Sequence, residues 1–81
     1  MMYSVSHLCK GTRCLKVVST YVHHNQFPCY VVRVYLLRGR KAHYARDRAT
    51  FSKIHNAETF HAEQVLHFVG KGYDITSSTC K

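Results

Sequence analysis

The sequence is poor in acidic residues and lacks long apolar runs. Four Asp and Glu residues stand against twelve Lys and Arg, which gives a net charge of +8 in 81 residues. No segment approaches the roughly 20 apolar residues that a membrane-spanning helix requires, and residues 1–14 contain no apolar core of signal-peptide length. We therefore expect a soluble protein of the cytoplasm or the nucleus, without a membrane partner, whose four cysteines are reduced thiols.

What the sequence does have is a globular composition with a strong positive charge. Hydrophobic residues make up 46% and aromatic residues 12%, which favours one small folded domain rather than a disordered chain. The excess of Lys and Arg favours binding to nucleic acid or to another anionic surface. A generic basic surface without a specific partner is an equally good interpretation of the charge alone.

The middle of the chain predicts β-structure. Residues 15–22 favour a strand over a short helix, and residues 29–37, interrupted only by Arg33, are so apolar that we expect a strand covered on both faces. A Gly-centred turn at 38–40 then returns the chain through residues 41–49 as a hairpin. Residues 1–14 show no clear pattern, and we expect a loosely ordered arm there, followed by a single domain over 15–81.

A helix and a last strand complete the prediction. The helix has an apolar stripe formed by Ala62, Val65, Leu66 and Val69. Ser52, Asn56 and Thr59 are candidate caps at its start, and Gly70 and Gly72 end it. Residues 73–80 favour a strand. Because the helix connects the hairpin to this strand, we expect the strand to lie parallel to a hairpin strand, in an α/β fold.

His61 and Glu63 are the candidate chemical residues. Residues two apart project about 200° from each other on a regular helix, so these two side chains converge only in a first turn. The backbone N–H groups of a first turn are free and point out of the helix. A pocket built over that end can therefore hold both the imidazole of His61 and the carboxylate of Glu63. The structural alternative is that His61 is a partly buried histidine and that Glu63 is a partner of the helix dipole.

The tripeptide His61-Ala62-Glu63 after a basic hairpin resembles the first half of a zinc-dependent cytidine deaminase. The run from Cys29 through "HAEQVLHFV" is most similar to the AID/APOBEC-like polynucleotide deaminases. The resemblance implies a three-layer deaminase fold, of which this chain holds the hairpin, the helix and the following strand. It also implies that His61 binds Zn²⁺ and that Glu63 is the general acid/base that moves the proton.

The second motif of that family, P-C-x-x-C, is missing. Only Cys80 follows His61, nineteen positions later and without a preceding proline, so it is a weak candidate for a second zinc ligand. A catalytic zinc site needs three protein ligands. We therefore expect an incomplete Zn²⁺ site, an inactive isolated chain, and a second chain as the source of the remaining ligands.

A basic stretch with one aromatic ring is the candidate nucleic-acid site. It comprises Arg38, Arg40, Lys41, Tyr44, Arg46 and Arg48. This combination holds single-strand phosphates and stacks a base, although a solvated, charged hairpin edge has the same composition.

Two functions are consistent with the sequence. The first is a fragment or truncated form of a polynucleotide cytidine deaminase, which hydrolyses cytosine to uracil in single-stranded DNA or RNA. The alternative is a non-enzymatic basic module that binds single-stranded nucleic acid or a protein partner, in which His61 and Glu63 serve the structure.

Overall fold

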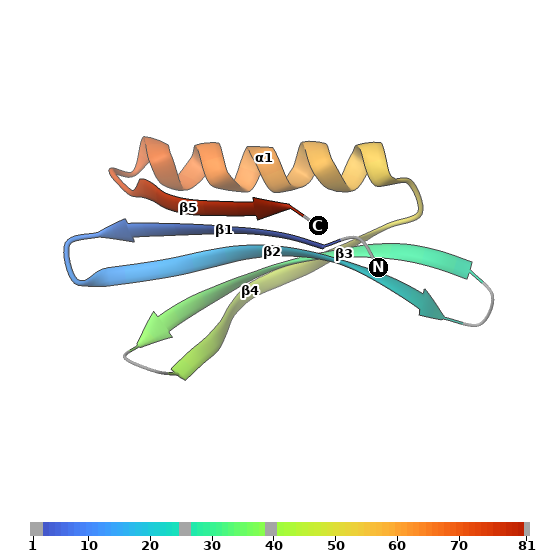
Figure 1. Ribbon diagram of the computed structural model, residues 1–81, viewed down its shortest axis with the longest axis horizontal. Helices are drawn as coiled ribbons and strands as arrows, with labels where there is room; N and C mark the ends of the chain where they lie inside the picture. The colour runs from blue at the N-terminus through green and yellow to red at the C-terminus, as the bar shows by residue number, and fades with distance from the viewer. Residues whose placement is uncertain (1–2, 25–26, 39–40, 81) are drawn as a thin grey trace.

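The computed structural model describes residues 3–24, 27–38 and 41–80. Within these ranges, the side chains of residues 3, 23–24, 27–28, 38, 41–48 and 80 lie outside the description. Five strands and one helix follow in the order β1 (Tyr3–Lys10), β2 (Arg13–His24), β3 (Phe27–Arg38), β4 (Lys41–Phe51), α1 (Ile54–Gly70) and β5 (Asp74–Cys80) (Figure 1). The chain thus forms an α/β fold, as the sequence predicts.

The five strands form one antiparallel sheet in the order β4-β3-β2-β1-β5. Strands β1 to β4 are consecutive hairpins, and α1 then carries the chain from one edge of the sheet to the other. The predicted hairpin of β3 and β4 is confirmed. The expectation that the last strand lies parallel to a hairpin strand is wrong, because β2 occupies the free side of β3 and β5 pairs antiparallel with β1.

The first residues are part of the sheet, in contrast to the loose arm that we expected over 1–14. β1 pairs with β2 in a continuous register from Tyr3↔Thr20 to Lys10↔Arg13. Gly11 has a φ of 62° and forms the tight turn between these strands. The mixed polarity of this segment reflects an amphipathic strand, with Leu8 fully buried.

Cys9 and Cys14 form a disulfide, which corrects the expectation that all cysteines are thiols. They are register partners on β1 and β2, and the short turn brings their Cα atoms to 4.1 Å. Directly opposed strand positions bring side chains close enough to bond. Cys29 is a free thiol.

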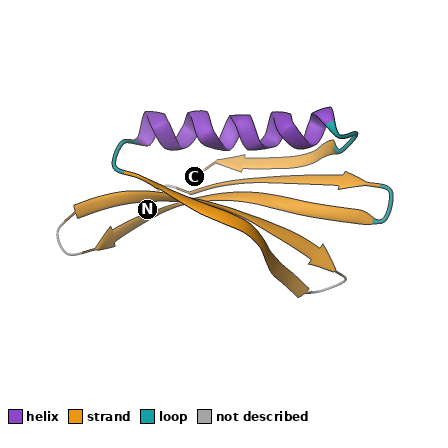
Figure 2. Ribbon diagram, turned by 180° about the vertical axis from the view of Figure 1, so that it is seen from behind, coloured by secondary structure: helices purple, strands orange, loops and turns teal. Residues whose placement is uncertain are grey.

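The core lies between α1 and one face of the sheet (Figure 2). Its buried members are Leu8, Leu15, Val17, Val32, Val34 and Ala57, and aromatic side chains such as Phe51 and Phe60 pack against them. The described residues form two layers, sheet and helix, with no second layer on the other face of the sheet. Val31, which points to that other face, is nevertheless buried at 6% exposure. The prediction that both faces of residues 29–37 are covered is therefore confirmed on the helix side and, on the other side, at Val31.

α1 begins earlier than the sequence suggested. Lys53 stands at its N-cap with extended backbone and no side-chain cap. Of the predicted caps, Ser52 lies before the helix, whereas Asn56 and Thr59 lie within it. The Thr59 hydroxyl instead donates to the His55 carbonyl oxygen at 2.9 Å.

The end of α1 is well defined at the predicted glycines. The backbone N–H of Gly72 donates to the Val69 carbonyl and that of Tyr73 to the Phe68 carbonyl. With Gly72 at a φ of 98°, these bonds form a Schellman motif, and the Phe68–Tyr73 ring contact at 5.7 Å supplies its hydrophobic closure. None of the described helices is both long and apolar enough to cross a membrane.

Candidate functional site

His61 lies in the middle of α1 and faces the sheet. It is 9% exposed and bridges two strands: its Nε2 lies 2.9 Å from the Ser6 hydroxyl of β1, and its Nδ1 lies 2.6 Å from the Ser19 hydroxyl of β2. Ser6 is also buried, and its hydroxyl lies 3.5 Å from that of Ser78 on β5. The imidazole thus connects the helix to the centre of the sheet.

Burial lowers the pKa of His61 from its ordinary value of 6.5. The ring is therefore neutral at physiological pH, with one nitrogen donating and the other accepting a hydrogen bond. A serine hydroxyl does either, so both tautomers are satisfied. Neither ring nitrogen is left with a lone pair directed at an ion.

Glu63 is exposed on the opposite side of α1. The convergence with His61 that we predicted requires a first turn, but the helix already begins at Ile54. Two residues apart in mid-helix, the two side chains point about 200° from each other. The structure does not bring them together.

The described residues do not fit a zinc site. They contain no group of three His, Cys, Asp or Glu side chains that could hold a metal ion. Cys80 is at the end of β5, and its side chain lies outside the described residues. His61 already uses both nitrogens in its bonds to Ser6 and Ser19.

The predicted basic stretch maps to the β3–β4 hairpin at one edge of the sheet. Arg38 ends β3 opposite Lys41, which begins β4, and Tyr44 is the register partner of Tyr35. Arg46 and Arg48 are further along β4. Arg40 lies outside the described residues, as do the side chains of the other five.

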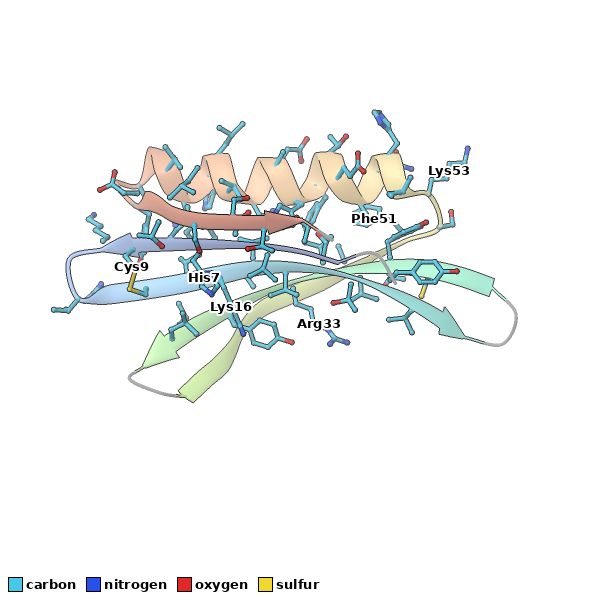
Figure 3. The ribbon with its side chains drawn as sticks, viewed as in Figure 1. His7, Cys9, Lys16, Arg33, Phe51 and Lys53 are labelled. Atoms are coloured by element: carbon cyan, nitrogen blue, oxygen red, sulfur yellow. A yellow bond between two sulfur atoms is a disulfide. The ribbon has the colours of Figure 1, made fainter. Side chains whose placement is uncertain are left out.

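A cluster that the sequence analysis did not single out lies on the uncovered face of the sheet. We call Lys16, Arg33 and Tyr35 the open-face cluster. The Lys16 ammonium lies 5.3 Å from the centre of the Tyr35 ring, its register partner. Figure 3 shows Lys16 and Arg33 pointing away from α1.

Arg33 occupies an irregular point of the sheet. The β3–β4 register shifts between Val32 and Val34, on either side of it. Such bulges redirect a side chain and are frequent beside binding sites. The described part of the chain offers no hydrogen-bond acceptor to the buried Nε of Arg33. A buried donor without an acceptor is rare in a native protein.

The open-face cluster had a signal in the sequence. Arg33 is the sole interruption of the apolar run 29–37, but the significance of Lys16 depends on the β2–β3 register, which the sequence alone does not give. Of the four acids, Glu58 and Glu63 lie on α1, and Asp74 pairs with Cys9 near the outer corner of the sheet. Asp47 lies on β4 opposite Arg33, between Arg46 and Ala49, and its side chain is outside the description. The described side chains of the cluster are two cations and one aromatic ring.

Comparison with known proteins gives no relative for this chain: no family model, curated protein or solved structure matches it.

Proposed function

We propose that this protein is a small basic module that binds single-stranded nucleic acid on the uncovered face of its sheet. The observation that carries the proposal is the open-face cluster, in which Lys16 lies over the ring of Tyr35 and Arg33 is two positions before Tyr35 on β3. Basic side chains next to an aromatic ring on an open sheet are the combination that holds a single strand: cations contact the phosphates, and a base stacks on the ring.

A nucleic acid base is expected to bind the Tyr35 ring more strongly than the Lys16 ammonium does. An exposed cation–π contact is worth about 0.5–1 kcal/mol, whereas a stacked base contributes about 1–3 kcal/mol. A base on Tyr35 therefore replaces the Lys16 ammonium at a net gain, and the released ammonium contacts a phosphate. The guanidinium of Arg33 supplies a second group that contacts a phosphate.

The charge of the whole chain supports the same function. A net charge of +8 attracts a polyanion from a distance and raises its association rate. The Arg and Lys residues of the β3–β4 hairpin lie next to the open-face cluster in the strand order, because β3 carries Arg33 and Tyr35. We include this hairpin in the proposed surface.

The test is fluorescence anisotropy with labelled single-stranded DNA and RNA over a series of salt concentrations. We expect Tyr35→Ala to weaken binding roughly five- to a hundredfold because a base no longer stacks there, and Tyr35→Phe to retain most of the affinity. Lys16→Ala and Arg33→Ala should each reduce the slope of log K against log salt by about 0.7 for each phosphate that the variant no longer neutralises.

The matched control is Lys53→Ala. Lys53 is an exposed cation before the first residue of α1, on the covered side of the sheet. This variant removes the same charge, so binding that falls equally in Lys53→Ala and Lys16→Ala reflects total charge and contradicts a site on the open face. Binding that does not depend on salt contradicts the proposal as well and indicates a protein partner.

The zinc-dependent deaminase is the competing proposal, and the H-A-E tripeptide supports it. In that function His61 must leave Ser6 and Ser19 to bind the metal, and a second chain must supply the other ligands. Zinc that copurifies with the chain and is absent from His61→Ala is the result that would favour it over the binding module.

A further inference from the structure

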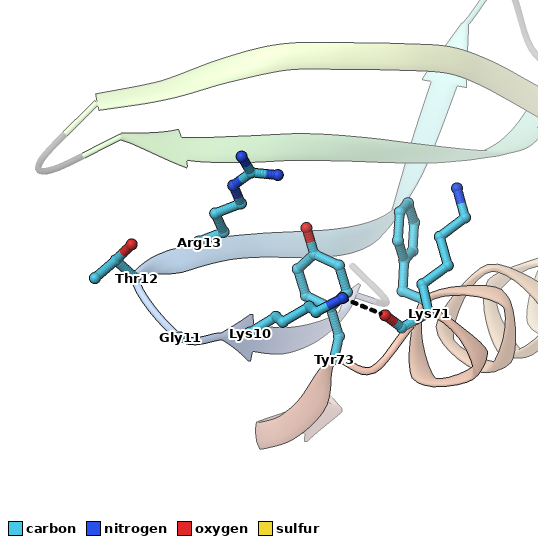
Figure 4. Close-up of a pocket in the computed structure, with 7 residues that line it drawn as sticks. Lys10, Gly11, Thr12, Arg13, Lys71 and Tyr73 are labelled. Atoms are coloured by element: carbon cyan, nitrogen blue, oxygen red, sulfur yellow. Dashed lines mark hydrogen bonds between the residues drawn. The ribbon is translucent and has the colours of Figure 1, made fainter.

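A second basic site lies at the end of the molecule where α1 stops. It is a cavity of about 540 Å³ between the β1–β2 turn and the connection from α1 to β5 (Figure 4). We call it the turn pocket. Its lining residues are Lys10, Gly11, Thr12, Arg13, Phe68, Lys71 and Tyr73.

The turn pocket is separate from the open-face cluster. Along β2, Arg13 shares the side of Leu15 and Val17, which are buried beneath α1, whereas Lys16 is on the other side. Lys10 shares the side of Leu8 in the same way. The two basic sites therefore lie on opposite faces of the sheet.

The pocket is rich in hydrogen-bond donors. Lys10 donates through Nζ to the Lys71 carbonyl oxygen at 2.8 Å, which leaves its other N–H groups for a ligand. Arg13 contributes a guanidinium with five N–H donors. Lys71 holds its ammonium over the Phe68 ring at 5.9 Å. No acidic side chain is among the described residues that line the pocket.

The C-terminal end of a helix disfavours an anion, because its free carbonyl groups carry partial negative charge. Here those carbonyls are engaged. Phe68 and Val69 accept backbone hydrogen bonds from residues 71–73, and the Lys71 carbonyl accepts from Lys10. The partial negative charge at this end of the helix is at most about half an elementary charge. It is therefore smaller than the combined positive charge of Lys10, Arg13 and Lys71.

Gly72 shapes the wall of the pocket. A Cβ at this position would lie 3.3 Å from Cε of Lys10, and the φ of 98° already favours glycine. The absence of a side chain lets the stem of Lys10 lie against the backbone, where its ammonium reaches the Lys71 carbonyl oxygen at the pocket wall. Gly72 thus acts as a positioning residue for Lys10.

We propose that the turn pocket binds a phosphate monoester. A dianionic phosphate offers three terminal oxygens to the donors of Lys10, Arg13 and Lys71, whereas a carboxylate offers two oxygens and a single charge. The pocket is partly open to solvent, and its three cationic side chains are exposed. It leaves room for the group that carries the phosphate, beside the Tyr73 hydroxyl and the Thr12 hydroxyl. The source is either the terminal phosphate of a nucleic acid strand or a free phosphorylated compound.

Two titrations of the full chain distinguish these sources. The first compares oligonucleotides of one sequence with and without a 5′-phosphate, and the second uses a nucleoside monophosphate, with inorganic phosphate as a competitor. Tighter binding of the phosphorylated oligonucleotide assigns the pocket to strand ends. Equal binding of the two oligonucleotides, together with binding of the monophosphate, assigns it to a free compound.

Arg13→Ala and Lys10→Ala should each weaken the phosphate-dependent binding about tenfold, because each removes a charged hydrogen bond. Gly72→Ala, which retains all charges, should weaken it as well. Lys53→Ala is the control and should leave the ratio between phosphorylated and unphosphorylated oligonucleotides unchanged. A ratio of one without binding of the monophosphate overturns the proposal. Phosphate-dependent binding, of the oligonucleotide or of the monophosphate, that is insensitive to Arg13→Ala overturns it as well. Failure of the open-face site leaves this ratio unaffected, so the two proposals fail separately.

Discussion

The position of His61 in the structure favours a structural role over the zinc-binding role that the sequence suggested. The sequence places it beside Glu63, as in the resembled deaminase motif, but its two ring nitrogens bond to serines on β1 and β2. Ser6 and Ser19 are far from it in the sequence, and no local pattern connects them to residue 61. The structural alternative that we raised, a buried histidine, agrees with its exposure of 9%.

Removal of this imidazole should destabilise the fold. We expect His61→Ala to lower the free energy of unfolding by about 2–4 kcal/mol, because it creates a cavity and leaves two hydroxyls without their partner. Urea denaturation followed by circular dichroism measures the change. His55→Ala, at an exposed position of the same helix, is the control and should stay within about 0.5 kcal/mol of the natural chain. An equal decrease in both variants would contradict the bridging role.

The same residue predicts a dependence of stability on pH. Burial lowers the pKa of His61 in the folded chain below its ordinary value of 6.5. The unfolded chain therefore binds a proton first as the pH falls. The contribution of the neutral imidazole is complete above pH 6.5, and it disappears as the pH falls from there through the lowered pKa.

Comparison with His61→Gln isolates this effect, because glutamine retains a donor and an acceptor but does not titrate. We expect the unfolding free energy of the natural chain to fall more steeply below pH 6.5 than that of the variant. The other histidines are common to both chains and cancel in the difference. Parallel profiles would show that His61 does not remain neutral in the fold.

At the level of elements, the hairpin and the helix follow from local sequence, and their neighbours do not. The apolar, β-branched run of residues 29–37 predicts the strand. The predicted helix stripe is wrong in its face, because Ala62, Leu66 and Val69 are exposed and only Val65 of that stripe packs against the core. The Schellman motif at Gly72 has a local signal too. The start of α1 has none, because Lys53 is not a capping residue and the contacts of the helix with the sheet override the weak preference.

β1 was missed for a related reason. Its helix side carries two serines with Leu8, its other side carries mixed residues, and its two buried apolar residues, Val5 and Leu8, point to opposite faces. A strand of this kind is stabilised by its register with β2 and β5, and the sequence does not reveal that register. The turn at Gly11 is the one local indication that the chain reverses there.

The disulfide between Cys9 and Cys14 is the covalent support of this hairpin. Its sequence separation is five residues, and closure of so short a loop stabilises the folded chain by about 2 kcal/mol. We expect a reductant to lower the unfolding free energy by this amount.

Alkylation mapped by peptide mass spectrometry checks the pairing directly. Cys9 and Cys14 should resist alkylation until the chain is reduced, whereas Cys29 should react once the chain is unfolded without reductant. The variant Cys29→Ser should keep the full response of stability to reductant. A response that disappears in this variant would assign the bond to a different pair.

For the molecule as a whole, the sequence predicts an α/β fold and a basic surface, but not on which face of the sheet each basic side chain lies. Which residues share a face of the sheet depends on the register between neighbouring strands. The sequence does not give this register, nor does it show that β5 pairs with β1 rather than with the β3–β4 hairpin. The open-face cluster and the turn pocket both combine residues from separate elements. A single sequence therefore indicates their charge without indicating that they are two sites.

The pairing of β5 with β1 also affects how the protein is made. On a ribosome that adds about 5–20 residues per second, β1 emerges several seconds before Asp74–Cys80. During this time the outer backbone groups of β1 have no strand to pair with, and another nascent chain can pair with them instead. The serines and threonines of β5 then provide the completed sheet with a polar rim that discourages edge-to-edge association.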